Sequence, residues 1–260
     1  MTSIGTTSKR VILNYNFQKV DTRDYKFLVN SDQLSAVSIP SNFSLKDKIT
    51  KIYDQGNLGS CVSNAFAGYI DMRTNHNLLI SRLFHYYCGR ILQGGRAVNY
   101  DTGLSLRGAA SVLKKYGTCK ETIWQYIISK FKIRPPTTVF RSARFLKNYT
   151  YLFLSQDLTS LTSYLYNQQL PILFGFYVYS SFMTDVVRTT GVVSMPNKAK
   201  DRLLGGHCVF IIGFDNTTRR FTCVNSWGAS WGNHGFFTIP YEYILDPSLA
   251  ADFCCLSFVY

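Results

Sequence analysis

The sequence lacks any apolar run long enough to cross a membrane. Its longest run, Leu170–Tyr179, has ten residues, whereas a transmembrane helix needs about 20. The first ten residues, Met1–Arg10, also lack the apolar stretch that a secretory signal requires. We therefore expect an intracellular protein without membrane contact, and this interpretation also allows packaging in a virus particle.

The cysteines follow neither the pattern of a disulfide scaffold nor that of a zinc site. Seven cysteines are an odd number, so at least one thiol stays free. No CxxC pair occurs, and His207 and Cys208 are adjacent, which is not a zinc-ligand spacing. We expect a reducing compartment, one reactive thiol, no metal and no other cofactor.

Charged residues are scarce, at 17% of the chain, and are mostly positive. Twenty-eight Lys and Arg against 15 Asp and Glu give a net charge of +13, which carries no information about the fold. No stretch combines dense Lys and Arg with a recognisable binding motif. A solvated basic surface is the simplest interpretation, and binding of nucleic acid or of acidic substrates is the open alternative.

The apolar pattern changes character near residues 145–150. Helical spacing begins at Cys61, after Ser81 and at Leu106, where Ser81 suits an N-cap and Gly117 a helix stop. Short aromatic and β-branched runs then predict strands at 171–178, 208–214, 220–225, 235–239 and 253–259.

Helices followed by strands predict an α+β protein of two lobes with a cleft between them. We assign residues 1–40 to an extended N-terminal arm, 41–147 to a helical lobe and 148–260 to a sheet lobe.

Cys61 lies where the first predicted helix begins, directly after the glycine-containing segment Gln55–Ser60. Free N–H groups and the macrodipole at a helix N-terminus favour a thiolate. His207 precedes one predicted strand and Asn225 follows the next, so their side chains can lie side by side. A thiol, a base and an orienting amide form a nucleophile triad.

At these residues the sequence resembles the papain family of cysteine peptidases, from about Pro40 to the C-terminus. Gln55 stands six residues before Cys61, as does the family's oxyanion-hole Gln, and Asn225–Gly232 matches the family's Asn-Ser-Trp-Gly-x-x-Trp-Gly run. His207 falls within the usual spacing of about 130 to 150 residues from the cysteine, and Asn225 lies somewhat beyond it.

Two positions depart from the family pattern. Leu58 replaces a cysteine that usually forms a disulfide, and Val62 replaces a Trp beside the nucleophile. The first change suits a reducing compartment, and neither removes a catalytic group. Val20–Tyr25 and Asp101–Arg107 look more like the signal-less bacterial and viral branches than like animal cathepsins.

The resemblance implies a papain-like fold that hydrolyses peptide bonds in protein or peptide substrates. Cys61 would attack the carbonyl, His207 would transfer the proton, and Asn225 would orient the imidazole under the shield of Trp227. The Gln55 side chain and the Cys61 N–H would bind the oxyanion. We expect the chain to act as a monomer.

The resemblance also implies a substrate groove, made by Gly103, Gly175, Gly206, Trp227 and Ala251. Ala251 would form the floor of the S2 pocket, with Gly103 and Gly175 near its walls. Such small residues predict a preference for Leu, Val or an aromatic residue at the P2 position of a substrate.

Two other functions remain open. The same triad could transfer the acyl group to an amine instead of water, or the domain could be a silent module that binds a partner through its basic surface. The intact set of Gln55, Cys61, His207 and Asn225 argues against the silent module.

The arm before Pro40 is longer than the family's catalytic domains usually carry and shorter than its usual helical propeptide. It could pack permanently on the outside of the lobes, or lie in the cleft as a short prosegment of a zymogen. Its lack of periodicity suits an extended, strippable segment, and we favour partial blockage of Cys61.

Overall fold

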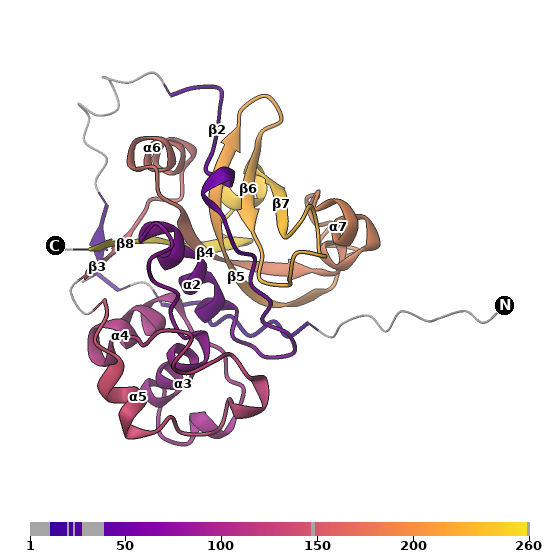
Figure 1. The fold of residues 1–260 in the computed structure, drawn as a ribbon. Helices are drawn as coiled ribbons and strands as arrows, with labels where there is room; N and C mark the ends of the chain where they lie inside the picture. Colours follow the sequence, from indigo (N-terminus) through magenta and orange to yellow (C-terminus); the bar gives the residue numbers. More distant parts are fainter. Residues whose placement is uncertain (1–10, 20, 23, 28–38, 147–148, 259–260) are drawn as a thin grey trace.

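The computed structural model describes residues 11–19, 21–22, 24–27, 39–146 and 149–258. A helical lobe lies below a large, strongly curved sheet in the view of Figure 1. The helices are α2 (Cys61–Arg73), α3 (Arg82–Leu92), α4 (Leu106–Tyr116), α5 (Thr137–Ser142), α6 (Leu158–Gln168), α7 (Asp185–Thr190) and α8 (Tyr241–Leu245). Short 3-10 turns are η1 (Lys46–Lys48), η2 (Ala97–Asn99), η3 (Ile128–Lys130) and η4 (Ser180–Met183).

The strands form one sheet with the order β1-β3-β8-β4-β5-β6-β7, to which β2 is added by pairing with β5. They are β1 (Tyr25–Lys26), β2 (Asn42–Ser44), β3 (Tyr149–Phe153), β4 (Ile172–Tyr179), β5 (Leu203–Asp215), β6 (Arg220–Val224), β7 (Phe236–Pro240) and β8 (Ala250–Phe258). The α+β, two-lobe architecture expected from the sequence is confirmed.

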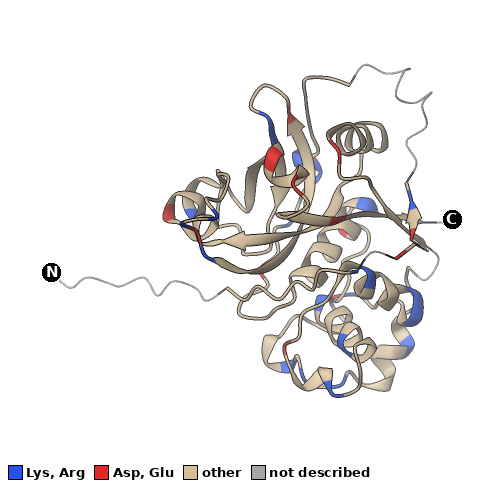
Figure 2. Cartoon of the chain, turned by 180° about the vertical axis from the view of Figure 1, so that it is seen from behind, with Lys and Arg blue, Asp and Glu red and all other residues tan. Residues whose placement is uncertain are grey.

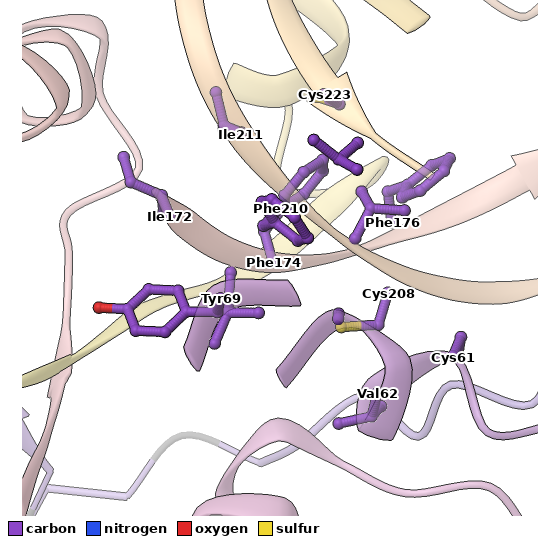
Figure 3. Close-up of a cluster of buried hydrophobic side chains, with 14 of the residues drawn as sticks. Cys61, Val62, Tyr69, Ile172, Phe174, Phe176, Cys208, Phe210, Ile211 and Cys223 are labelled. Carbon is purple, nitrogen blue, oxygen red and sulfur yellow. The ribbon is translucent and has the colours of Figure 1, made fainter. Parts of the chain in front are cut away.

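Helix α2 is the central element, because the sheet covers one side of it and the helical lobe covers the other. Every residue of α2 except Arg73 is buried, so the helix expected to begin at Cys61 is covered on all sides. Gly68 allows the close approach to β5, since a Cβ there would lie 2.7 Å from the Phe210 ring. Tyr69 then joins α2 to β8, accepting the Leu256 N–H at 3.0 Å and donating to its carbonyl at 3.1 Å. Figure 3 shows this contact layer.

The local signals at the other helix ends are confirmed. The Ser81 hydroxyl accepts the Phe84 N–H at the start of α3, and Gly117 ends α4 with a φ of 70°, in the left-handed region that favours glycine.

Two short segments ahead of the helices pair with the sheet. β1 pairs with β3, and β2 pairs with β5 beyond the end of β4, at Gly213 to Asp215. The arm and the segment assigned to the helical lobe therefore each add one short strand to the sheet. Extended segments do this because their unpaired backbone groups can complete a sheet edge.

Within the described residues, no helix is long and apolar enough to span a membrane. All seven cysteines are free and buried, and the described His, Cys, Asp and Glu side chains form no cluster of three that could hold a metal. Figure 2, the view from behind, shows Lys and Arg concentrated on the helical lobe.

Candidate active site

Cys61 is the first residue of α2 and is fully buried. Figure 3 shows it near Cys208 of β5, where α2 meets the sheet. The backbone N–H groups of Cys208, Val62 and Cys61 itself all favour the thiolate. The sulfur therefore lies at a helix N-terminus and beside the residue that follows His207.

His207 and Asn225 are brought together by adjacent strands, His207 within β5 and Asn225 directly after β6. The His207 Nε2 lies 2.8 Å from the Asn225 Oδ1. Since an amide oxygen only accepts, Nε2 carries the proton and Nδ1 is left as the basic nitrogen. Nδ1 is buried without a hydrogen-bond partner, and the Trp227 ring covers the imidazole with ring centroids 4.9 Å apart.

Gln55 is held so that its amide nitrogen points into the cleft. Its Oε1 accepts from the Ser226 hydroxyl at 2.7 Å, and its Nε2 donates to the Leu58 carbonyl at 3.0 Å. The same Nε2 also donates to the carbonyl of Ile12 at 3.2 Å. A peptide carbonyl of the N-terminal arm thus binds the amide that the sequence assigned to an oxyanion hole.

The arm crosses the cleft as an extended strand that touches both lobes. The Tyr15 N–H donates to the Gly206 carbonyl on β5, and the Asn16 N–H donates to the Leu104 carbonyl ahead of α4, both at 3.0 Å. The Asn14 side chain donates to the Asp101 carbonyl at 2.8 Å. The described part of the arm therefore bridges the two lobes through backbone hydrogen bonds to each.

Glycines on both walls make room for the arm. A Cβ at Gly103 would lie 1.6 Å from the Asn14 carbonyl oxygen, and one at Gly175 would lie 2.0 Å from the Tyr15 ring. The arm thus contacts three of the five residues expected in the substrate groove, which are Gly103, Gly175 and Gly206. Trp227 lies beside His207 instead.

The pocket that holds Tyr15 differs from the expected one. The Tyr15 hydroxyl donates to the Asp252 carboxylate at 2.6 Å, so Asp252 is a pocket residue that the expected set did not contain. Ala251 pairs with Gly175 across β8 and β4, and Gly175 lies against the Tyr15 ring. The register of β8 against β4 shifts between Leu173 and Gly175, and Asp252 has a φ of 64°. Such an irregularity redirects side chains.

Asp101 is a site residue that the sequence interpretation missed. Its carboxylate accepts the Gly59 N–H with both oxygens, at 2.9 and 3.1 Å, and also the Tyr86 hydroxyl. It therefore fixes the loop just before Cys61, beside Leu58, where the family usually has a disulfide cysteine. No sequence signal beyond that missing cysteine pointed to it.

Burial in the closed site disfavours charge on Cys61 and His207. It raises the pKa of the Cys61 thiol to about 12, although the neighbouring N–H groups lower it. Burial also lowers the pKa of His207 to about 4, although the Asn225 hydrogen bond raises it. Desolvation therefore favours the neutral thiol and the neutral imidazole while the arm is in place.

Comparisons with known proteins agree with this geometry. Residues 39–244 match the model of a family described as papain family cysteine protease. A peptidase C1-like protein of Acanthamoeba polyphaga mimivirus is 34% identical over 262 residues, which cover 94% of this chain and 82% of that protein. Cathepsin B-like cysteine proteinase 5 of Caenorhabditis elegans is 27% identical and covers 83% of this chain and 76% of its own.

A solved structure extends the likeness to the whole described fold. Xylellain, a cysteine protease from Xylella fastidiosa, superimposes with a TM-score of 0.86 and 31% identity, covering 95% of this chain and 96% of its own. Procathepsin B S9 of Trypanosoma congolense, at 20% identity and a TM-score of 0.69, shares the fold.

Gly175→Ala should open the cleft. The added Cβ takes space that the Tyr15 ring fills, and Gly175 needs no left-handed φ, so Tyr15 is the group that must move. We expect Cys61 to react with iodoacetamide at least about tenfold faster. A tenfold change requires the closed form to lose only ~1.4 kcal/mol of free energy relative to the open form. The matched control is Gly95→Ala, where a Cβ meets nothing within 4 Å. Equal labelling rates in the two variants would show that Tyr15 does not close the site.

The closed arm should be most stable between about pH 6.5 and 9. In the closed protein the pKa of His207 is about 4, whereas in an opened, solvated protein it returns to its ordinary value of 6.5. Below pH 6.5 the opened protein therefore binds a proton that the closed protein does not bind, so acid favours opening. Above 9 an opened protein loses the Cys61 proton that the closed form keeps, so base favours opening as well. Asp252, whose pKa is raised by burial, opposes the effect at the acid end.

Amide hydrogen exchange measures this equilibrium. After correction for intrinsic rates, protection of the Tyr15 and Asn16 N–H groups should fall by up to roughly thirtyfold from pH 7.5 to 5, while the β6 amides stay protected. Unchanged protection of both arm amides would contradict the linkage.

Proposed function

The chain belongs to the papain family of cysteine proteases, and we propose that it hydrolyses peptide bonds through Cys61, His207 and Asn225, with Gln55 in the oxyanion hole. The observation that carries this proposal is the Ile12 carbonyl on the Gln55 Nε2 at 3.2 Å. It places a peptide carbonyl on the donor that a tetrahedral oxyanion would use. Acyl transfer to an amine and a silent binding role draw support from no contact of the described site.

The chemistry begins once water reaches the site. Solvation lets the Cys61 proton pass to the His207 Nδ1, and the thiolate then attacks the substrate carbonyl carbon to form a C–S bond. The oxygen that gains the negative charge is held by the Gln55 Nε2 and the Cys61 N–H. His207 gives its proton to the leaving amine as the C–N bond breaks.

Deacylation uses the same groups in the opposite sense. His207 takes a proton from a water molecule, whose oxygen attacks the acyl carbon. The C–S bond then breaks, and His207 returns the proton to the sulfur, which releases the acid and restores the Cys61 thiol. The Asn225 Oδ1 holds the Nε2 proton throughout, so that Nδ1 faces the sulfur, and Trp227 keeps water away from that bond.

The arm acts as the gate of this site. Ile12 occupies the oxyanion donor, Tyr15 fills the glycine-walled pocket, and the strand between them keeps Cys61 and His207 dry. A prosegment has this effect until it is cut or displaced, so we infer a zymogen in which residues before Pro40 are removed or swung out.

The pocket of Tyr15 defines the substrate preference of the open enzyme. With the arm gone, the partly buried Asp252 carboxylate loses the Tyr15 hydroxyl and also the Gln18 N–H, which donates to it at 3.2 Å. A half-buried carboxylate is stabilised by a cation or a hydroxyl donor. The sequence predicted Leu, Val or an aromatic residue at P2. Because of Asp252, we propose Arg, Lys or Tyr instead, of which Tyr agrees with the aromatic part of that prediction.

The catalytic assignment is tested in a Tyr15→Ala background, which empties the pocket and leaves the four catalytic groups intact. Cys61→Ala should abolish cleavage of a small peptide substrate, and Gln55→Ala should lower kcat by about 10² to 10³, the usual cost of one oxyanion donor. Retention of full activity by Cys61→Ala would refute the mechanism. A Cys88→Ala control, which removes a buried thiol of the helical lobe, should keep kcat.

The specificity assignment is tested with a peptide library varied at P2. Arg should exceed Leu in kcat/KM by roughly tenfold or more, and Asp252→Ala should reverse that order. Asp47→Ala on η1 removes a carboxylate elsewhere and should leave the ranking unchanged. A preference for Leu that survives in the unmodified pocket would mean that Asp252 does not face the substrate.

A further inference from the structure

Positive charge is concentrated on the part of the helical lobe formed by residues 107–144. This stretch holds nine Lys and Arg and a single acidic residue, Glu121, so it supplies +8 of the net charge of +13. Glu121 is paired with Arg82 at 3.0 Å. Eight of the cations are exposed: Lys114, Lys115, Lys120, Lys130, Lys132, Arg134, Arg141 and Arg144.

Aromatic rings hold five of these cations in place. Each cation lies over a ring, with 5.4 to 6.0 Å between its charged group and the ring centroid. The pairs are Lys115 with Tyr116, Lys120 with Phe145, Lys130 with Trp124, Lys132 with Phe131 and Arg134 with Phe140. We call this region, residues 115–145, the basic surface; Figure 2 shows its charge on the lower lobe.

Large apolar side chains are exposed among these cations. Ile123 is 45% exposed, Ile127 38%, Ile133 52% and Phe145 39%. They share turns with the lysines: the Ile123 N–H donates to the Lys120 carbonyl, the Lys130 N–H to the Ile127 carbonyl, and the Ile133 N–H to the Lys130 carbonyl. Exposed apolar and cationic residues thus alternate along the turns of this segment.

This combination distinguishes between polyanionic partners. A nucleic acid would neutralise the lysines with phosphates but would leave the aliphatic side chains in water. An anionic bilayer satisfies both kinds of group, since headgroups attract Lys and Arg while short apolar tips insert among the acyl chains. We propose that the basic surface docks on a membrane with anionic headgroups, a role that is independent of the peptidase mechanism.

The basic surface adjoins the active site. The Tyr126 hydroxyl donates to the Gln55 carbonyl at 2.9 Å, and the Ile128 side chain closes over Gly56, where a Cβ would lie 2.6 Å from it. Docking through Ile127 and Lys130 would therefore bring the Gln55 side of the cleft close to the headgroups. Polypeptide segments at the bilayer surface would then be presented to the enzyme.

Vesicle co-sedimentation of the full chain tests the proposal. Binding to phosphatidylcholine vesicles that contain phosphatidylserine should be at least about tenfold tighter than to phosphatidylcholine alone. Lys130→Glu with Lys132→Glu should weaken it by roughly 25-fold or more, about fivefold for each charge removed. Ile123→Ser with Ile133→Ser should weaken it by about tenfold, and Ile133→Ser alone serves if the double variant does not fold.

The controls separate docking from plain charge attraction. Lys200→Glu with Arg202→Glu makes the same charge change ahead of β5 and should alter vesicle binding by less than about twofold. Duplex DNA is titrated in parallel. Three results would overturn the proposal: no preference for phosphatidylserine, vesicle binding that is unchanged by the Ile substitutions, or binding to DNA without binding to vesicles. The third result would identify a nucleic-acid surface.

Discussion

The contact between the arm and the two cleft walls governs the rest of the site. Because Gly103 and Gly175 have no side chains, a polypeptide backbone can lie directly against both lobes. The arm uses this space through the hydrogen bonds of Tyr15 and Asn16, and in the proposed function a peptide substrate uses the same space. Under that proposal, inhibition and recognition depend on the same two walls, so a change that admits the substrate more easily also loosens the arm.

In the proposed zymogen, exclusion of water is the means by which the arm controls the chemistry. The hydrogen bond from His207 to Asn225 and the position of Cys61 at the start of α2 are already present in the closed form. What the closed form lacks is the solvation that a thiolate and an imidazolium need. Under this proposal, opening the cleft changes the solvation of Cys61 and His207 more than their supporting contacts.

The parts predicted correctly from sequence depend on local chemistry. Ser81 caps a helix and Gly117 ends one with contacts inside four residues, and the Asn225–Gly232 run marks a family by itself. Helix α6 was missed although Asp157 caps it by accepting the Ser160 N–H, a signal that was available. The sequence raised a course of the arm in the cleft but not its contacts, because those depend on pairing with distant segments. The part played by Asp252 could not be predicted, because it depends on a register shift between β4 and β8.

The segment around Tyr126 serves two surfaces at once, and this explains its composition. Its inner side supports the loop before Cys61 through the Tyr126 hydroxyl and the Ile128 side chain, which accounts for these partly buried aromatic and aliphatic groups. Ile123 and Ile133 face outward and add nothing to that support. Exposed isoleucines between lysines gain free energy only when another phase or partner removes them from water, so the outer side of this segment is built for contact.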